Sequence, residues 1–284
     1  MFYRTTALAT VAALTASMAH ADAHAGLSGY ALANGGSTLV VMADLSNPSA
    51  VSTYDLEMPI AGLATRPVTG ELYGISDGMV VTINPMSGEI TDTGATFADD
   101  AMLGADAMVA FDFNNAIDAV RAVSSEGTNL VYFPEGFGDN DERANSVLRF
   151  TDAFYVDGDA NVGTTPMIFA NAYTNAIVGS TAESTFQYAL DAETDSLVAL
   201  ANNAGELTTI AAVTVEGEPI DLSGMGGFDI FSPEEGTDQA YAILQAEGVD
   251  DAGLFSIDLE TGAATPITGL GMGGFTGFAV GAAM

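Results

Sequence analysis

The chain has 284 residues, of which 38 are Asp or Glu, 5 are Lys or Arg and none is Cys, so its formal net charge is −33. This charge excludes nucleic acid and anionic membrane surfaces as partners, and the lack of cysteine excludes disulfides, thiolate nucleophiles and Cys-ligated metals. Because 48% of the residues are hydrophobic, the chain can bury a sizeable core and is not predicted to be disordered.

The first residues have the pattern of a secretory signal peptide. Arg4 supplies the positive start, Ala7 to Ala16 form a short apolar run, and Ala19-His20-Ala21 fits a cleavage site. The apolar run is too short to span a membrane. We therefore predict a signal peptide over residues 1–21 and a single domain over residues 22–284, exported to the periplasm or the extracellular space.

The two histidines, His20 and His24, lie in the predicted signal and beside its cleavage site, with cleavage after Ala23 or Ala25 as the alternatives. We therefore expect a folded domain without histidine, which excludes Ser-His-Asp catalysis and imidazole metal ligands. The chain also has no lysine, so it lacks a Schiff-base nucleophile and a phosphate-binding loop. No catalytic residue is predicted, and an enzyme is not the favoured hypothesis.

A tripeptide of an aromatic, a small and an aliphatic residue recurs at Tyr30-Ala31-Leu32, Tyr73-Gly74-Ile75, Tyr188-Ala189-Leu190 and Tyr241-Ala242-Ile243, and Arg121-Ala122-Val123 repeats it without the aromatic residue. Subtracting successive start positions gives spacings of 43, 48, 67 and 53 residues. This is the period of a four-stranded propeller blade. The sequence thus predicts an all-β fold, a β-propeller of five blades of four antiparallel strands, with six blades as the alternative.

A second motif precedes each later tripeptide and occurs once more at the end of the chain, at Gly62-Leu63-Ala64, Ala110-Phe111-Asp112, Ala172-Tyr173-Thr174, Gly227-Phe228-Asp229 and Gly277-Phe278-Ala279. The first repeat lacks this motif, and the last copy has no tripeptide after it. The two ends of the chain therefore complement each other. We predict that N-terminal and C-terminal strands share one blade, which closes the ring and removes exposed sheet edges.

Strands and hairpin turns are recognisable within the repeats. In the second repeat we expect strands over 72–76, 79–84 and 89–93, and in the last repeat over 240–244, 254–258 and 263–268. The turns Asn84–Gly88 and Asp258–Gly262 begin with a residue that can bond its own backbone and end with a glycine that permits positive φ.

The third repeat, Met108 to Tyr173, is the longest and least regular. It contains FDFNN at 111–115, D-x-x-R at 118–121, TNL at 128–130, GDANVGTTP at 158–166 and, at its end, AYTN at 172–175. With these segments, and more weakly with GFDI at 227–230 and the LETGAAT turn, the chain resembles a family of bacterial exported proteins described as a domain of unknown function, DUF4394. Val131-Tyr132 departs from the polar residue that this family usually has after TNL. The resemblance implies a repeat β fold and export but no activity.

Arg121 stands where the other repeats have tyrosine, on a strand expected near the central channel. A buried arginine needs partners, and Asp112 or Asp118 could pair with it; alternatively its guanidinium binds an anionic ligand such as a carboxylate. The candidate ligand-binding residues are polar side chains of this irregular region, namely Asp112, Asn114, Arg121, Asn129, Tyr173 and Asn175.

Asp157, Asp159 and Asn161 present oxygen atoms at alternate positions, as calcium loops do, and calcium suits an acidic protein. The sixth position of the helix-loop-helix calcium motif is glycine, but here it is Val162. A turn without an ion accounts for the same residues. Calcium is the one candidate cofactor.

The favoured hypothesis is an exported, monomeric propeller that binds a small molecule, a glycan or a protein, or serves as a scaffold. Its site is expected where the third repeat meets the channel or one face. Because a propeller fold supports many functions, two alternatives stay open. One is a calcium-dependent hydrolase or lyase that uses carboxylates and Arg121, and the other is an acidic structural or matrix protein that collects cations.

Overall fold

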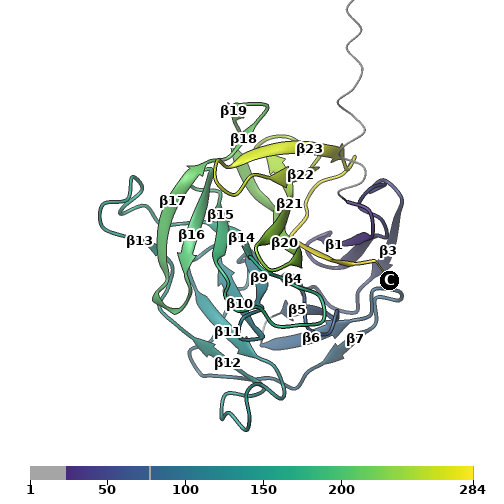
Figure 1. The fold of residues 1–284 in the computed structure, drawn as a ribbon, viewed down its shortest axis with the longest axis vertical. Coiled ribbons are helices and arrows are strands. Elements are labelled where there is room, and N and C mark those ends of the chain that lie inside the picture. Colours follow the sequence, from purple (N-terminus) through teal and green to yellow (C-terminus); the bar gives the residue numbers. More distant parts are fainter. Residues whose placement is uncertain (1–23, 77, 284) are drawn as a thin grey trace, which may run out of the picture.

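The computed structural model describes residues 24–76 and 78–283, and these residues form five β-sheets arranged as blades around a central axis (Figure 1). The only helical segment among them is one 3-10 turn, Asn202–Ala204. The prediction of an all-β propeller with five blades is confirmed. The predicted signal peptide, residues 1–21, lies outside the described residues, and no helix within the described ranges is long and apolar enough to cross a membrane.

Each blade has four antiparallel strands. From the axis outward they are β24 (Gly277–Ala282), β1 (Leu27–Ala33), β2 (Thr38–Met42) and β3 (Val51–Asp55) in the first blade; β4 (Gly62–Thr65), β5 (Leu72–Ser76), β6 (Met79–Ile83) and β7 (Ile90–Asp92) in the second; β9 (Val109–Asn114), β10 (Ala119–Ser124), β11 (Asn129–Phe133) and β12 (Ser146–Arg149) in the third; β14 (Ile168–Tyr173), β15 (Gln187–Asp191), β16 (Ser196–Ala201) and β17 (Glu206–Ala212) in the fourth; and β20 (Leu222–Glu234), β21 (Thr237–Ala246), β22 (Gly253–Ile257) and β23 (Ala263–Gly269) in the fifth.

Short extra strands cover the outer edges of three blades. β8 (Thr96–Phe97), β13 (Phe154–Tyr155) and β18 (Thr214–Val215) pair in parallel with β12, β17 and β23, and β19 (Glu218–Pro219) pairs with β18. Each parallel strand belongs to the segment that leads from one blade to the next. Two-residue strands carry no periodic signal, so the sequence did not predict them.

The ring closes as predicted. β24 pairs with β1, and Ala279 lies opposite Tyr30 in the same sheet as β2 and β3. The last strand of the chain is thus the innermost strand of the first blade. This pairing leaves no open edge at the axis, where the two ends of the chain would otherwise expose unpaired backbone groups.

The strand register confirms that Arg121 occupies the tyrosine position, because Arg121 in β10 faces Asp112 in β9 just as Tyr241 in β21 faces Asp229 in β20. It corrects the second motif in the fourth blade. Tyr188 faces Ala172, so the equivalent tripeptide is Ala170–Ala172 and not the predicted Ala172–Thr174. A shift of two residues leaves every side chain on the same face of a strand, so the alternating pattern could not reveal the error.

Packing between blades explains why the second motif begins with a small residue. A Cβ atom at Gly62 would lie 2.7 Å from the Cβ of Phe111 in the next blade, and one at Gly227 would lie 2.5 Å from that of Phe278. The large middle residue of each motif thus fits over the small first residue of the preceding blade. The middle residues meet at the axis and leave a cavity of only about 10 Å³; they are Leu63, Phe111, Asn171, Phe228 and Phe278.

The expectation of a folded domain without histidine is wrong. His24 precedes β1, is only 6% exposed, and places its Nδ1 atom 2.8 Å from the hydroxyl oxygen of Tyr241. The chain before β1 packs against β21 of the fifth blade, so this residue belongs to the core. Its role could not be seen in a segment that resembles the end of a signal peptide.

Candidate functional site

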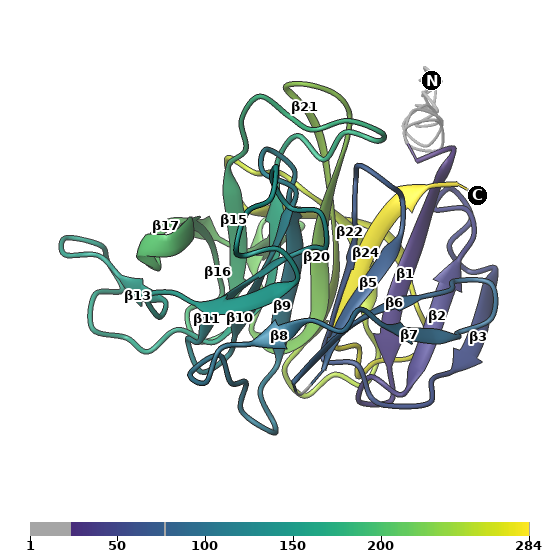
Figure 2. The ribbon, with the colours of Figure 1, turned by 90° about the horizontal axis from the view of Figure 1, so that it is seen from below.

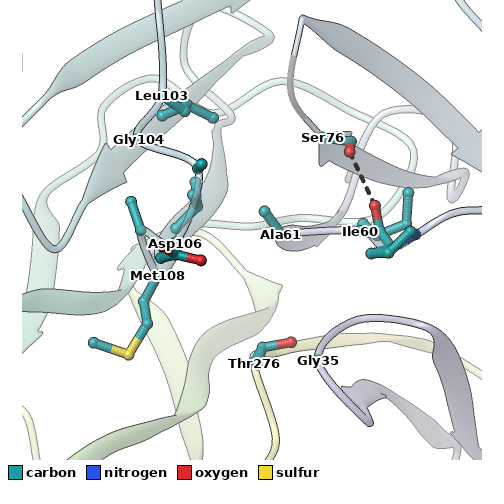
Figure 3. A pocket seen from close by; sticks show the side chains of 13 residues that line it. Gly35, Ile60, Ala61, Ser76, Leu103, Gly104, Asp106, Met108 and Thr276 are labelled. Carbon is teal, nitrogen blue, oxygen red and sulfur yellow. Dashed lines mark hydrogen bonds between the residues drawn. The ribbon is translucent and has the colours of Figure 1, made fainter.

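Seen from the side, the innermost strands run between two faces of the ring (Figure 2). We call the face where these strands begin the start face and the face where they end the end face. A cavity of about 350 Å³ opens between the first three blades at the start face (Figure 3). Its lining consists of Gly35, Pro59, Ile60, Ala61, Ser76, Leu103, Gly104, Ala105, Asp106, Ala107, Met108, Val109 and Thr276.

The wall of this start-face cavity is mostly apolar and has few polar side chains. Asp106, in the segment between β8 and β9, is the one charged residue among the described residues of the lining. The hydroxyl of Thr276 is buried and has no hydrogen-bond partner among the described residues. Ser76 donates its hydroxyl to the carbonyl of Pro59 at 2.9 Å. The cavity can therefore hold an apolar group, and its described residues offer the Asp106 carboxylate and the Thr276 hydroxyl.

Sequence reasoning did not nominate Asp106 or Thr276. Both lie in segments that lead into an innermost strand, β9 and β24 respectively, and these segments have no strand periodicity. They come from repeats far apart in the chain and meet only because the ring closes between them. The irregular length of the third repeat was the single available signal, and Met108 and Val109 at its start do line the cavity.

The predicted residues Arg121, Asn129 and Tyr173 come together elsewhere, between the third and fourth blades. Arg121 is 4% exposed, and its Nε donates to the hydroxyl of Tyr173 at 2.9 Å. Nη1 donates to Oδ1 of Asn129 at 2.5 Å and Nη2 to Oδ1 of Asn203 at 2.7 Å. The guanidinium carbon lies 5.9 Å from the ring centre of Phe150. Neutral oxygens and an aromatic ring hold this cation.

The expected ion pair of Arg121 with Asp112 or Asp118 is therefore wrong. Asp118 pairs with Arg66 of the second blade, and Asp112 accepts the backbone N–H of Tyr173 at 2.7 Å. Both acids are bound by groups of neighbouring blades, which the order of residues along the chain does not reveal.

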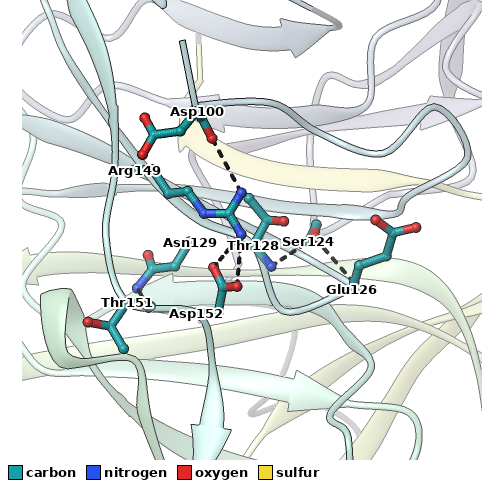
Figure 4. Close-up of polar contacts among 8 residues, drawn as sticks. All are labelled: Asp100, Ser124, Glu126, Thr128, Asn129, Arg149, Thr151 and Asp152. Carbon is teal, nitrogen blue, oxygen red and sulfur yellow. Dashed lines mark hydrogen bonds and ion pairs between the residues drawn. The ribbon is translucent and has the colours of Figure 1, made fainter. Parts of the chain in front are cut away.

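The network extends further into the boundary between these two blades. The Tyr173 hydroxyl lies 2.9 Å from Oε1 of Gln187 and 2.7 Å from Oδ1 of Asn202, and burial raises the pKa of Tyr173 to about 12. The amide nitrogen of Asn129 donates to the carbonyls of Thr151, at 2.9 Å, and Asn202; Figure 4 shows Asn129 beside Thr151. The network fastens the two blades together, and a ligand at Arg121 stays a prediction.

Asn114 and Asn175 hold a loop on the end face. Oδ1 of Asn114 accepts the hydroxyl of Thr185 at 2.9 Å, and Oδ1 of Asn175 accepts the backbone N–H of Gly236 at 2.7 Å. Asn175 has φ of 60°, a left-handed conformation that asparagine tolerates better than most residues. The structure therefore places these two predicted residues at the base of the loop over residues 174–186.

Two buried carboxyl groups occupy the third position of the second motif. Asp112 accepts the N–H of Tyr173, and Asp229 accepts the N–H of Val280 at 2.5 Å, so each reaches the innermost strand of the next blade. Burial raises the pKa of Asp229 to about 7. Burial, followed by the charge of Asp229, raises the pKa of Asp112 well above its ordinary value.

The predicted calcium residues are only partly brought together. Asp159 accepts the backbone N–H of Asn161 at 2.8 Å and that of Thr209 at 2.7 Å, and Asn161 donates to the Thr209 hydroxyl. Asp157 is exposed. Within the described ranges no group of three or more His, Cys, Asp or Glu residues is placed to hold a metal. Calcium at this turn stays a prediction, to be checked by calorimetric titration of the wild type and Asp157→Asn.

The profile of one protein family, described as domain of unknown function (DUF4394), matches residues 40–279. No curated protein matches the chain in sequence. An auxiliary nutrient binding protein from Bacteroides thetaiotaomicron is 14% identical, with a TM-score of 0.44 over 75% of this chain and 55% of its own. A protein of unknown function from the same species is 15% identical, with a TM-score of 0.50 over 78% and 54%. The chain spans just over half the length of these proteins. The likeness to the second of them shows the fold alone.

Proposed function

Because the chain belongs to the DUF4394 family, whose description assigns no activity, we propose from its own geometry that it is a binding propeller. The cavity of about 350 Å³ on the start face carries this assignment. Its volume falls in the range of sites for small organic ligands, and its apolar wall with a few polar groups is typical of them. The start of the third repeat, at Met108 and Val109, contributes to this cavity, but none of the six ligand-binding residues predicted from the sequence lines it.

The ligand that fits best is a small organic molecule that is neutral or positively charged. Asp106 would attract a cationic group, and Thr276 offers a hydroxyl that can donate or accept a hydrogen bond. The net charge of −33 repels anions and raises the local concentration of cations. Ile60 and Met108 would contact the apolar part of the ligand.

Ligand binding is tested by screening small cationic and neutral molecules for an increase in melting temperature, followed by calorimetry on the hits. Ala61→Phe fills the cavity and is expected to abolish binding. Asp106→Asn keeps the shape but removes the charge, and is expected to weaken a cationic hit by about tenfold. Asp139→Asn, at an exposed turn, is the matched control. Binding that survives Ala61→Phe would place the ligand elsewhere.

We further propose that the protein acts outside the cytoplasm, in the periplasm or the extracellular space, after removal of residues 1–21. Burial of His24 against Tyr241 supports cleavage after Ala21 over cleavage after Ala25, because the later cut would remove a core side chain. The intact mass of the exported protein checks this, and a mature chain that starts at Gly26 would contradict it.

A further inference from the structure

The innermost strands turn one backbone N–H each toward the axis at the level just past the second motif. In an antiparallel strand, the backbone groups of successive residues point alternately toward the partner strand and away from it. The residue after the third position of each second motif therefore points its N–H toward the axis; these residues are Thr65, Phe113, Tyr173, Ile230 and Val280. Asp112 accepts the N–H of Phe113 and Tyr173. Asp229 accepts the N–H of Ile230, at 2.7 Å, and Val280. Two carboxyl groups thus bind four of the five amides.

Thr65 occupies the fifth position of this set. By the equivalence of the blades, the residue that would reach it is Ala279, whose methyl group offers no acceptor. The hydroxyl of Thr65 is also buried and has no hydrogen-bond partner in the described part of the chain. Among the described residues, this side of the axis therefore has an unpartnered hydroxyl and lacks a carboxyl group like those of Asp112 and Asp229.

A cavity of about 70 Å³ lies at this place, and we call it the end-face cavity. Its lining includes Tyr30, Thr65, Asp229, Ile230 and Val280. Asp229 is only 5% exposed, and its carboxyl group makes no ion pair with any of the described residues. It is thus a buried acid without a cation.

The backbone supplies further oxygen atoms to the end-face cavity. In an antiparallel strand the C=O of a residue points to the same side as its N–H. The carbonyls of Thr65, Ile230 and Val280 therefore point toward the axis beside the Asp229 carboxyl. Carboxylate, hydroxyl and carbonyl oxygens are the ligands of hard cations.

The loop over residues 174–186 covers the end-face cavity. The N–H of Gly179 donates to the carbonyl of Pro67 at 2.9 Å, and Ile177 pairs with Ser232, so the loop reaches the second and fifth blades. Val178 from this loop contributes to the cavity lining. The cavity is far smaller than sites for organic ligands, but it can hold an ion with a few water molecules.

We propose that the end-face cavity binds an alkali-metal cation, Na⁺ or K⁺, through the Asp229 carboxylate, the Thr65 hydroxyl and the inward-facing carbonyls. One positive charge matches Asp229, the single carboxylate among the described residues of the lining, whereas calcium sites usually combine several. An anion is disfavoured by Asp229 and by the net charge of −33. The cation would lie beside Thr65, at the level of the axis where Asp112 and Asp229 bind the backbone amides of the other innermost strands.

The test is thermal unfolding at a pH where Asp229 is ionised, in NaCl, KCl or choline chloride of equal ionic strength. Na⁺ or K⁺ is expected to raise the melting temperature of the wild type saturably, by about 2–4 °C beyond choline. Asp229→Asn and the isosteric Thr65→Val are expected to lose this increment. Asp112→Asn is the matched control, because it removes the equivalent carboxyl outside the cavity, and it is expected to keep the increment.

Equal melting temperatures in all three salts would overturn the proposal. An increment that persists in Thr65→Val and Asp229→Asn would overturn it too, because the cation would then bind elsewhere. Stabilisation by calcium alone would show that the site prefers a divalent ion and would contradict the assignment. None of these outcomes depends on the cavity at the start face.

Discussion

Arg121 shows how much a repeat pattern predicts about a single position. Its equivalence to four tyrosines was predicted from the repeats and is confirmed by the strand register. Its partners were not predicted, because Tyr173 and Asn203 lie 52 and 82 residues away in the chain and reach it only across a blade boundary. The side chain is held by neutral oxygens, a costly arrangement unless every contact is made.

We expect Arg121→Leu to lower the free energy of unfolding by about 2–4 kcal/mol, because it leaves the buried groups of Asn129 and Tyr173 without their donor. Urea unfolding measures the change. Arg149→Leu is the control, since Arg149 pairs with Asp152 at the surface (Figure 4), where such pairs contribute about 1 kcal/mol or less. Equal losses in the two variants would argue against a network specific to Arg121.

The raised pKa of Asp229 predicts a pH dependence of stability. Because its pKa in the folded state is about 7, above the ordinary 3.8, the protonated form is favoured on folding. Its contribution is complete below about pH 4 and is lost as the pH rises through 7. In choline buffer, Asp229→Asn is expected to gain stability relative to the wild type over this interval, by a few kcal/mol in total. A constant difference between the two proteins from pH 4 to 8 would contradict this assignment.

At the scale of elements, the local sequence pattern determines where the strands begin and end. Contact with the next blade determines the position of the second motif. Strand β5 has the predicted bounds, Leu72–Ser76, because alternation and turn chemistry both lie within the hairpin. The fourth copy of the second motif was misplaced by two residues, because its identity depends on pairing with Tyr188. The small first residue of each motif is explained only by the large middle residue of the next blade, which packs against it.

Gly227→Ala tests this packing. The added Cβ would lie 2.3 Å from the backbone nitrogen of Phe278, an atom that cannot move aside without shifting β24. We expect a loss of about 2–4 kcal/mol in unfolding free energy. Gly269→Ala, where a Cβ meets nothing within 4 Å and φ is not positive, is expected to change stability by about 0.5 kcal/mol or less. Similar small effects at both positions would contradict the account.

The whole molecule is a ring whose stability depends on its closure by β24. This strand pairs with β1, and its Val280 donates to Asp229 of the fifth blade. Without it, β1 becomes an open innermost edge, and the large side chain of Phe278 is lost from the axis.

A chain truncated after Thr276 is therefore expected to lose cooperative unfolding or to aggregate. Circular dichroism and size-exclusion chromatography measure this outcome. Truncation after Ala282, which leaves β24 intact, is the control. A soluble, cooperatively unfolding chain without β24 would show that the other four blades hold the ring by themselves.

The sequence by itself determined the class of fold and the closure of the ring and favoured five blades over six, because these follow from local alternation and turn residues repeated along the chain. Its composition also determined the acidic charge and the absence of thiol chemistry. Only the tertiary structure decided the place of His24, the partners of Arg121 and the positions of the two cavities. These depend on contacts between blades, which join residues far apart in the chain, such as Asp229 and Val280 at a separation of 51 residues. A pattern that repeats within each blade does not specify which side chains contact each other between blades.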